Sequence, residues 1–226
     1  MSRTAQTPRA PRNRTRVLLV DDHPLVRERL AEVINRETDL TVCGEAEDRH
    51  GAVELVNKKQ PDLVIIDLKL KNSDGLELIK DIRSRWPAMR MLVVSMHDEA
   101  LYAERVIRAG ALGYITKQEA TRKILSAIRR VLTGNIYLNE KIANQIISRL
   151  TAHAGSATAN PAELLADREF QVFELTGYGH NTHEIARRLH IAVKTVETYR
   201  ARIREKLKLR DASELLRLAI TWSRRQ

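Results

Sequence analysis

Four side chains that lie far apart in the 226-residue chain are of the types that handle phosphoryl groups: Asp21, Asp22, Asp67 and Lys117. Short apolar runs end beside them, because RVLLV precedes Asp21, DLVII precedes Asp67 and ALGYIT precedes Lys117. Clustered carboxylates repel one another unless a divalent cation separates them, and Mg²⁺ favours one or two carboxylates together with phosphate oxygens. With a lysine beside them, these residues predict a phosphoryl site that uses Mg²⁺.

An alternation of strand and helix patterns, repeated five times, would bring these residues together. The predicted strands are 16–20, 40–44, 62–67, 91–95 and 112–116. Apolar residues at helical spacing occur between them, as in Leu25, Leu30, Val33 and Ile34. Continuous Val, Ile and Leu runs indicate strands buried on both faces, and the intervening helices require parallel crossovers. We therefore expect an α/β fold, a flavodoxin-like doubly wound (βα)5 sheet whose strand ends share one ligand-binding edge.

The composition is that of a globular protein, with 43% hydrophobic and 30% charged residues. No apolar run approaches the roughly 18 residues of a membrane span, and no apolar segment of a secretory signal follows the N-terminus. We therefore expect a cytoplasmic protein that does not bind membranes. The single cysteine, Cys43, is expected to be a buried structural thiol.

The net charge of +10 is distributed unevenly along the chain. Residues 1–16 carry five arginines and no acid, and residues 164–226 carry 13 basic against 8 acidic residues, so each region contributes +5. The remaining 21 basic and 21 acidic residues balance within residues 17–163. Localised basic charge is typical of nucleic-acid binding.

These patterns divide the chain into four regions. Residues 1–15 are predicted to be a disordered basic tail, with a DNA-contacting arm as the alternative. Residues 16–133 are the predicted α/β domain. Residues 134–163 are expected to be a linker, in which the helical pattern IYLNEKIANQIISRL precedes the flexible tether TAHAGSATANPAE. Residues 164–226 are predicted to be entirely helical.

The α/β region resembles the receiver domain of two-component response regulators. The resemblance rests on VDDHPLVRERL, on Asp67 followed by Gly75, on VVSMHDE and on AGALGYITK, which occur in that order. It implies that Asp67 is the phosphoacceptor, whose carboxylate attacks phosphorus and becomes an aspartyl phosphate. It also implies a sensor histidine kinase as the partner that supplies the phosphoryl group.

The same resemblance assigns roles around Asp67. The implied Mg²⁺ ligands are Asp22 directly, Asp21 largely through water, Asp67, and the backbone carbonyl of Lys69. Lys117 would pair with a phosphate oxygen, and Ser95 would donate its hydroxyl to the bound phosphoryl group. Tyr114 matches an aromatic switch position that turns inward on activation.

Some of these positions leave alternatives open. Asp21 taken alone would serve equally well as a cap of the following helix, and Tyr114 taken alone is more often a core aromatic residue. Many receivers have a methionine-proline step after the phosphoacceptor strand, where this chain has Leu70 and Lys71. We therefore expect a loop that is more flexible or more positive than usual.

The C-terminal region has the pattern of a helix-turn-helix domain. A first helix is expected from LADREFQVFELTGYG, with Asp167 as its N-cap, a second from NTHEIARRLH, and a third from VKTVETYRARIREKLKL. A helical wheel of the third places Val196, Ile203 and Leu207 on one face. The opposite face is polar and would be free to contact a DNA groove.

This region resembles the LuxR/NarL-type output domain through LADREFQVFEL, HEIARRLHIAVKTVETYRARIREKL and DASELLRLAI. The resemblance implies that residues 193–207 form the recognition helix for promoter DNA and that a last helix, at about 212–220, pairs two copies into a homodimer. The predicted DNA contacts are Lys194, Thr195, Glu197, Thr198, Arg200, Ala201, Arg202, Arg204 and Lys206. Glu197 would accept a hydrogen bond from cytosine or, as an alternative, form an ion pair with Arg200 or Arg204.

Together the two regions predict a two-component response regulator, in which phosphorylation of Asp67 controls DNA binding and hence transcription. We expect no enzyme activity beyond self-catalysed phosphorylation and dephosphorylation. A phosphatase that uses Asp67 as a transient nucleophile is one alternative, and turnover of a small phosphodonor would favour it. A DNA-binding protein with a degenerate receiver is another, and DNA binding that is indifferent to phosphorylation would favour that one.

Overall fold

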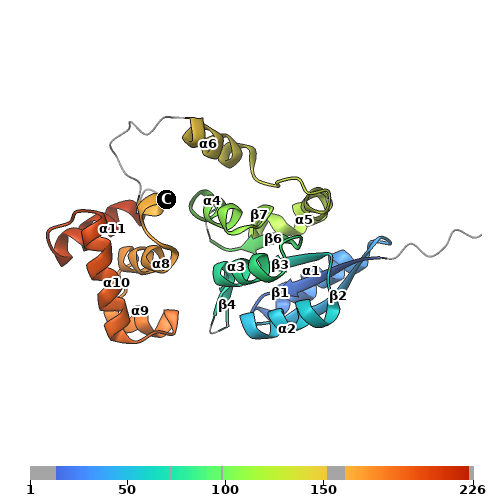
Figure 1. Ribbon diagram of the computed structural model, residues 1–226, viewed down its shortest axis with the longest axis horizontal. Coiled ribbons are helices and arrows are strands. Elements are labelled where there is room, and N and C mark those ends of the chain that lie inside the picture. Colours follow the sequence, from blue (N-terminus) through green and yellow to red (C-terminus); the bar gives the residue numbers. More distant parts are fainter. Residues whose placement is uncertain (1–13, 72, 98, 152–160, 224–226) are drawn as a thin grey trace, which may run out of the picture. The chain divides into compact units, whose positions relative to one another are not determined.

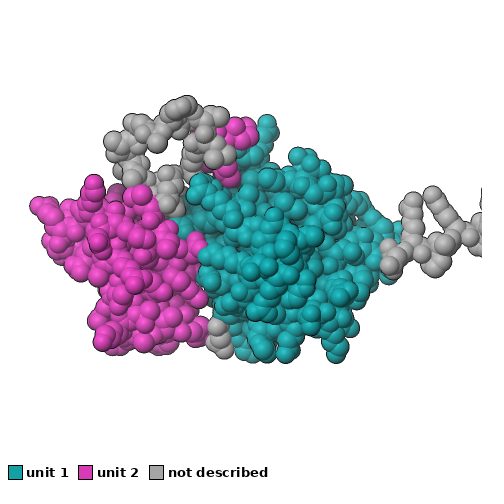
Figure 2. All heavy atoms as spheres, viewed as in Figure 1, with its two compact units in different colours: residues 1–143 teal, residues 144–226 magenta. Residues whose placement is uncertain are grey.

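The computed structural model divides into two compact units, residues 1–143 and residues 144–226 (Figure 2). The boundary between them falls within the helix α6 (Glu140–Thr151). The structure describes residues 14–71, 73–97, 99–151 and 161–223 (Figure 1).

The first strand, β1 (Thr15–Val20), begins one residue earlier than the sequence predicts. The Thr15 N–H donates to the Asp39 carbonyl at 2.9 Å, and the Arg14 guanidinium donates to the carbonyls of Glu37 and Thr38. Because these bonds tie the backbone to the start of the neighbouring strand, Thr15 belongs to the sheet and not to the predicted tail. The rest of that tail, residues 1–13, lies outside the described residues.

A five-stranded parallel sheet is the centre of the first unit, with the strand order β2-β1-β3-β6-β7. The strands after β1 are β2 (Leu40–Ala46), β3 (Leu63–Ile66), β6 (Arg90–Ser95) and β7 (Gly113–Thr116). Residues 17–20, 63–66 and 91–95 are all buried, as expected for apolar runs that pack on both faces of a parallel sheet. The predicted doubly wound fold is confirmed.

Helices cover both faces of the sheet (Figure 1). The helices α1 (Pro24–Asn35) and α5 (Lys117–Leu132) pack on one face through residues that include Leu30, Ile34, Ile124 and Ile128. The remaining helices of the sheet are α2 (Arg49–Lys59), α3 (Gly75–Arg85) and α4 (Glu99–Ala109). Leu25, one of the residues at helical spacing, is 79% exposed, because Val26 is the residue of that turn that packs against the core.

The strand order places the predicted site. β1 lies between β2 and β3, so the chain runs outward from β1 in both directions. Asp21 directly follows β1, and Asp67 directly follows the neighbouring β3. In open α/β sheets, ligands bind at such a reversal, outside the carboxyl ends of the strands.

Gly75 allows α3 to start directly against the backbone of Asp67. A Cβ atom at Gly75 would lie 2.1 Å from the Asp67 carbonyl oxygen and 2.7 Å from Leu68 Cα. Asp74 caps the helix, because its Oδ1 accepts a hydrogen bond from the Leu76 N–H at 2.8 Å. The glycine is therefore required by close packing beside the phosphoryl site that the sequence predicts.

The start of the linker differs from the predicted helix. The Tyr137 N–H donates to the Leu112 carbonyl at 2.8 Å, and its carbonyl accepts from the Tyr114 N–H at 3.0 Å. Tyr137 therefore extends the sheet beside β7, and α6 begins only at Glu140, where the Asn139 side chain caps its first turn. The physical reason is that β7 is the outer strand, whose backbone groups would otherwise lack partners on that side.

Four helices in the described part of the second unit match the predicted all-helical domain. They are α8 (Asp167–Gly177), α9 (Thr182–Leu189), α10 (Val193–Lys206) and α11 (Ala212–Ser223). Phe170, Phe173, Ile185, Val196 and Ile203 form the fully buried centre. Of the predicted tether, residues 152–160 lie outside the described residues, and Pro161–Leu164 form one helical turn, α7.

The predicted N-cap of α8 is wrong by one residue. Ala166 is the N-cap, and Asp167 is the first helical residue. The Ala166 N–H donates to Glu169 Oε2 at 2.8 Å, so the glutamate of the first turn satisfies the N–H of the N-cap residue, as the glutamate of a capping box does.

Two further expectations concern the single cysteine and membrane-spanning segments. Cys43 is half-buried, because β2 is an edge strand, and burial raises the pKa of its thiol. Within the described part of the chain, no helix has the length and apolar character needed to cross a membrane.

Candidate functional site

Asp67 lies at the centre of a buried charged cluster at the carboxyl edge of the sheet. Its Oδ1 accepts hydrogen bonds from Ser95 Oγ at 2.7 Å and from the Lys69 backbone N–H at 3.3 Å. Its Oδ2 lies 2.6 Å from Lys117 Nζ. The Asp67 side chain is only 3% exposed. The ends of three strands, β3, β6 and β7, thus bring the predicted catalytic residues together.

Lys117 is the cation of this cluster. Its Nζ lies 2.6 Å from Asp21 Oδ2 as well as from Asp67 Oδ2, and its side chain is 7% exposed. Burial by itself lowers the pKa of Lys117, but the hydrogen bonds to the two carboxylates outweigh it and raise this pKa above the usual value. The lysine is therefore charged at neutral pH and can partly neutralise the acidic edge.

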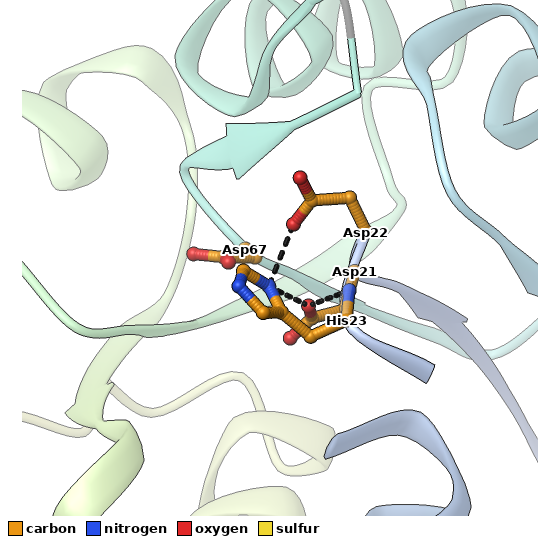
Figure 3. A group of neighbouring side chains, drawn as sticks. All are labelled: Asp21, Asp22, His23 and Asp67. Atoms are coloured by element: carbon orange, nitrogen blue, oxygen red, sulfur yellow. Dashed lines mark hydrogen bonds and ion pairs between the residues drawn. The ribbon is translucent and has the colours of Figure 1, made fainter. Parts of the chain in front are cut away.

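Asp22 and His23 complete the acidic edge (Figure 3). One ligand atom from each of Asp21, Asp22, His23 and Asp67 lies within 4.8 Å of all the others. Asp22 Oδ1 is buried and, although it is 2.7 Å from His23 Nδ1, it accepts no well-formed hydrogen bond from the residues that the structure describes. Three carboxylates and one ammonium leave two negative charges. This balance and the oxygen-rich donor set fit Mg²⁺.

Asp21 does not cap the helix that follows it, so that alternative is wrong. The N-cap of α1 is His23, whose side chain makes no capping bond. Asp21 Oδ1 instead accepts a hydrogen bond from the His23 N–H at 2.8 Å, while its Oδ2 faces Lys117. The carboxylate is thus held at the phosphoryl site.

The two predicted switch residues both lie inward. Tyr114 is buried, and its hydroxyl donates to the His97 carbonyl at 2.8 Å. His97 follows Ser95 by two residues, and Ser95 Oγ donates to Asp67. Tyr114 is therefore a core aromatic residue whose hydroxyl contacts the loop that follows the serine. Its role as a switch stays a prediction.

The loop after Asp67 is anchored to the rest of the unit. It forms a hairpin of β4 (Lys69–Leu70) and β5 (Ser73–Asp74), and Leu70 is buried. Lys71 Nζ lies 2.7 Å from Glu47 Oε1, and the Lys71 N–H donates to the Glu47 carbonyl. Leu70 and Lys71 therefore hold the loop in place, which opposes the flexibility expected from the missing proline. The predicted metal ligation by the Lys69 carbonyl stays a prediction.

In the second unit, α10 has the division into two faces that its sequence predicts. Val196 and Ile203 are fully buried, and Leu207 is half-buried. The exposed residues of the helix include Lys194, Glu197, Thr198, Ala201 and Arg202. Glu197 forms no ion pair with Arg200 or Arg204 among the described residues, which contradicts the salt-bridge alternative.

Two of the basic residues predicted to contact DNA have partners within the unit. The Arg200 guanidinium donates to side-chain and backbone oxygens of α8, of α9 and of the turn between them. Lys206 Nζ lies 2.7 Å from Oε2 of the buried Glu169. DNA contacts of Arg200 and Lys206 stay predictions, but both cations are committed to internal acceptors. Arg202, by contrast, has no hydrogen-bond partner within the described part of the chain.

Both units match known protein families. Residues 17–129 match the response regulator receiver domain, and residues 163–219 match the luxR family of bacterial regulatory proteins. The chain belongs to the response regulator family. Its two parts, a receiver and a LuxR-type DNA-binding domain, make it a two-component response regulator of the kind that acts as a transcription regulator.

Individual proteins similar to this chain support its assignment to the response regulator family. The uncharacterized transcriptional regulatory protein YxjL of Bacillus subtilis (strain 168) is 34% identical over 210 residues, which cover 92% of this chain and 96% of YxjL. The crystal structure of a LuxR-family two-component response regulator from Aurantimonas sp. SI85-9A1 is 35% identical, covers 61% of this chain and 99% of its own, and has a TM-score of 0.57. RcsB from Salmonella enterica serovar Typhimurium shares the fold at 24% identity, with 92% and 98% coverage and a TM-score of 0.63.

Two residues of the response regulator have contacts at or behind its sites that the sequence did not predict. The first is His23, which contacts both Asp21 and Asp22. Its position directly after these two acids in the sequence could have indicated a place at the acidic edge. The second is Glu169, which accepts hydrogen bonds from both the Ala166 N–H and Lys206 Nζ. No local pattern pairs Glu169 with Lys206, because they are 37 residues apart and meet only when α8 packs against α10.

Proposed function

We propose that a sensor histidine kinase phosphorylates this response regulator on Asp67 and that the phosphoryl group controls promoter binding by the second unit. The observation that carries the proposal is the environment of the Asp67 carboxylate, which has Ser95 at one oxygen and Lys117 at the other. A buried acid at the switch point of the sheet, with a hydroxyl and an ammonium directed at it, is arranged to become an acyl phosphate and not to serve only as an ion-pair partner.

In the proposed reaction, a carboxylate oxygen of Asp67 attacks the phosphorus of a phosphohistidine. The P–O bond forms as the P–N bond breaks, and the electron pair leaves with the imidazole nitrogen of the kinase. Lys117 moves its positive charge from Asp67 Oδ2 to a phosphoryl oxygen, and the Ser95 hydroxyl and the Lys69 N–H donate to the new group. Mg²⁺, held by Asp21, Asp22 and Asp67, would supply further neutralisation of phosphoryl charge.

Under this proposal the protein catalyses only its own phosphorylation and dephosphorylation and turns over no separate substrate. The anion on Asp67 draws the Ser95 hydroxyl to itself and thereby stabilises the inward position of Tyr114, whose hydroxyl bonds the loop two residues beyond Ser95. Phosphorylation thus biases one arrangement of the β6–α4 loop.

For the output, we propose that the exposed face of α10 contacts promoter DNA in the cytoplasm and that two copies bind inverted half-sites as a homodimer. α11 supplies an apolar surface for this pairing, because Leu216 is 42% exposed while Leu215 and Ala219 complete the core of the unit. The Salmonella RcsB structure was solved with promoter DNA and a phosphomimetic, which is the type of complex proposed for this chain.

The test uses fluorescence anisotropy on an inverted-repeat duplex selected by the protein from random sequences, in the presence of Mg²⁺. Wild-type protein with beryllofluoride, which mimics the aspartyl phosphate, is compared with untreated protein and with Asp67→Ala in both conditions. Tighter binding that needs both beryllofluoride and Asp67 is expected. Equal affinity in all four samples would contradict the phosphorylation control and leave DNA binding intact.

A further inference from the structure

Arg200 lies at the centre of the recognition helix, yet it faces the interior of the second unit. It shares one face of α10 with Val196 and Ile203, since the three are separated by four and three residues and both neighbours are fully buried. We propose that Arg200 is a positioning residue, which fixes the recognition helix against α8 and α9 and makes no phosphate contact. The proposal rests on the proposed DNA-binding function.

The guanidinium joins three elements at once. Nη1 donates to Oγ1 of Thr182, the first residue of α9, at 2.8 Å. Nη2 donates to Oγ1 of Thr176, in the last turn of α8, at 3.3 Å, and to the carbonyl of His180, between the two helices, at 3.4 Å. These bonds connect α10 to residues 18 to 24 positions earlier, so they hold the angle between the helices of the helix-turn-helix.

The acceptor on α8 is itself fixed. Thr176 is buried, and its hydroxyl donates to the Val172 carbonyl at 2.7 Å, so its single hydrogen is used and its oxygen is left to accept from Arg200. A threonine side chain held in this way is a rigid acceptor and not a solvent-facing group that would follow Arg200 toward DNA.

The residue type matters as much as the position. Arginine presents its donors in a planar fork, which can reach two helices at once, whereas lysine has one compact ammonium. Burial lowers the pKa of Arg200, and the Glu197 carboxylate acts in the opposite direction. Its hydrogen-bond acceptors in the described residues are all neutral, and its buried Nε has none. The guanidinium is thus half-buried and held by neutral acceptors, which suits a positioning role better than a salt-dependent contact to phosphate.

Arg202 offers a matched comparison on the same helix. It carries the same side chain two residues further on, is exposed, and has no hydrogen-bond partner among the residues described by the structure. If Arg202 contacts a phosphate, its removal will reduce the slope of log affinity against log salt. Arg200, as a positioning residue, will act only through the placement of its exposed neighbours such as Glu197 and Ala201.

The experiment measures affinity of the full-length, beryllofluoride-treated protein for two duplexes of equal length, the selected inverted repeat and a scrambled sequence, over a range of salt concentrations. The variants are Arg200→Gln, Arg200→Lys, Thr182→Val and Arg202→Gln. We expect Arg200→Gln to lose roughly tenfold in affinity for the selected duplex, as for the loss of a charged hydrogen bond, with binding to the scrambled duplex unchanged. The slope of log affinity against log salt should stay that of wild type.

The other variants separate the possible roles. Arg200→Lys should bind as weakly as Arg200→Gln, because charge without the fork does not restore the bonds. Thr182→Val should weaken specific binding in the same direction, and combining it with Arg200→Gln should add less than the sum, since both remove the same contact. Arg202→Gln should lower affinity for both duplexes and reduce the salt slope by about 0.9 per phosphate contact, hence by about 1.8 for the proposed dimer.

Several outcomes would overturn the proposal. A salt slope for Arg200→Gln reduced like that of Arg202→Gln, with Arg200→Lys close to wild type, would make Arg200 a phosphate contact. Unchanged specific binding by a folded Arg200→Gln protein would make its role purely one of stability. If wild-type protein binds neither duplex, the proposed DNA-binding function fails, and the positioning role of Arg200 is then tested by amide hydrogen exchange. Protection of α9 that is unchanged in Arg200→Gln would contradict the positioning role.

Discussion

The phosphoryl site and the recognition helix hold their charges in opposite ways. In the first unit, Asp67 and Lys117 are almost fully buried and pair with each other across the sheet. On α10, Lys194, Glu197 and Arg202 are exposed to solvent. Buried charges must be neutralised within the fold, so the phosphoryl site is a cooperative unit made by tertiary packing. Exposed charges are solvated, so each residue of the helix face can change without disturbing the others.

The largest effect should come from removing the cation of the buried cluster. Lys117→Gln leaves Asp21 and Asp67 without their ammonium partner, and we expect a loss of about 3 kcal/mol in unfolding free energy, measured by urea denaturation. Millimolar Mg²⁺ should recover part of this loss, because a divalent cation replaces the missing charge. The control is Lys71→Gln, whose pair with Glu47 has the lysine 56% exposed. An equal shift of the urea midpoint in both variants would contradict a distinction between buried and exposed pairs.

The next effect tests whether the phosphoryl site depends on packing by residues that carry no charge. Gly75→Ala places a Cβ against the Asp67 carbonyl, so we expect a loss of about 1–3 kcal/mol in stability and slower labelling by a small phosphodonor, followed by intact mass. Gly51→Ala is the control, because its Cβ would make an ordinary contact 3.4 Å from Asp48 Oδ1 within a helix. Phosphorylation of Gly75→Ala at the wild-type rate would show that the site tolerates displacement of this backbone.

A third variant tests an exposed charge on the recognition helix α10. Glu197→Ala should reduce discrimination at one base pair of the selected site by about 1–3 kcal/mol, while the urea midpoint stays unchanged, because the side chain is exposed and has no ion pair to Arg200 or Arg204. The measurement is competition between duplexes that differ at single positions. Glu205→Ala, an equally exposed acid near the other end of α10, should leave the base preference intact. A general loss of affinity without a change in preference would rule out base contact by Glu197.

The smallest effect concerns the contact between Tyr114 and the loop beyond Ser95. Tyr114→Phe removes one hydrogen bond to the His97 carbonyl, and we expect a loss of about 1 kcal/mol in stability together with a smaller gain in DNA affinity on beryllofluoride treatment. Tyr137→Phe is the control, since among the described residues its hydroxyl makes only a long 3.5 Å contact to Ser126. If both variants respond to beryllofluoride like wild type, the Tyr114 hydroxyl takes no part in the switch.

The sequence by itself determined the features that depend on local periodicity. Apolar runs ending beside Asp21, Asp67 and Lys117 were sufficient to predict strands and to gather their ends at one edge, because parallel strands leave no other arrangement. The buried face of α10 followed in the same way from the spacing of Val196 and Ile203. These predictions succeed because burial repeats with the geometry of the strand and the helix.

Only the tertiary structure decided which partners the long polar side chains reach. Arg200 was expected to contact DNA, and it donates to Thr176 and Thr182. Lys206 was expected to do the same, and it pairs with the buried Glu169. An arginine or a lysine has an apolar stem and a charged end that can extend toward either side of a helix. Its direction is therefore set by acceptors that distant segments supply when they pack, and no spacing within the helix reveals it.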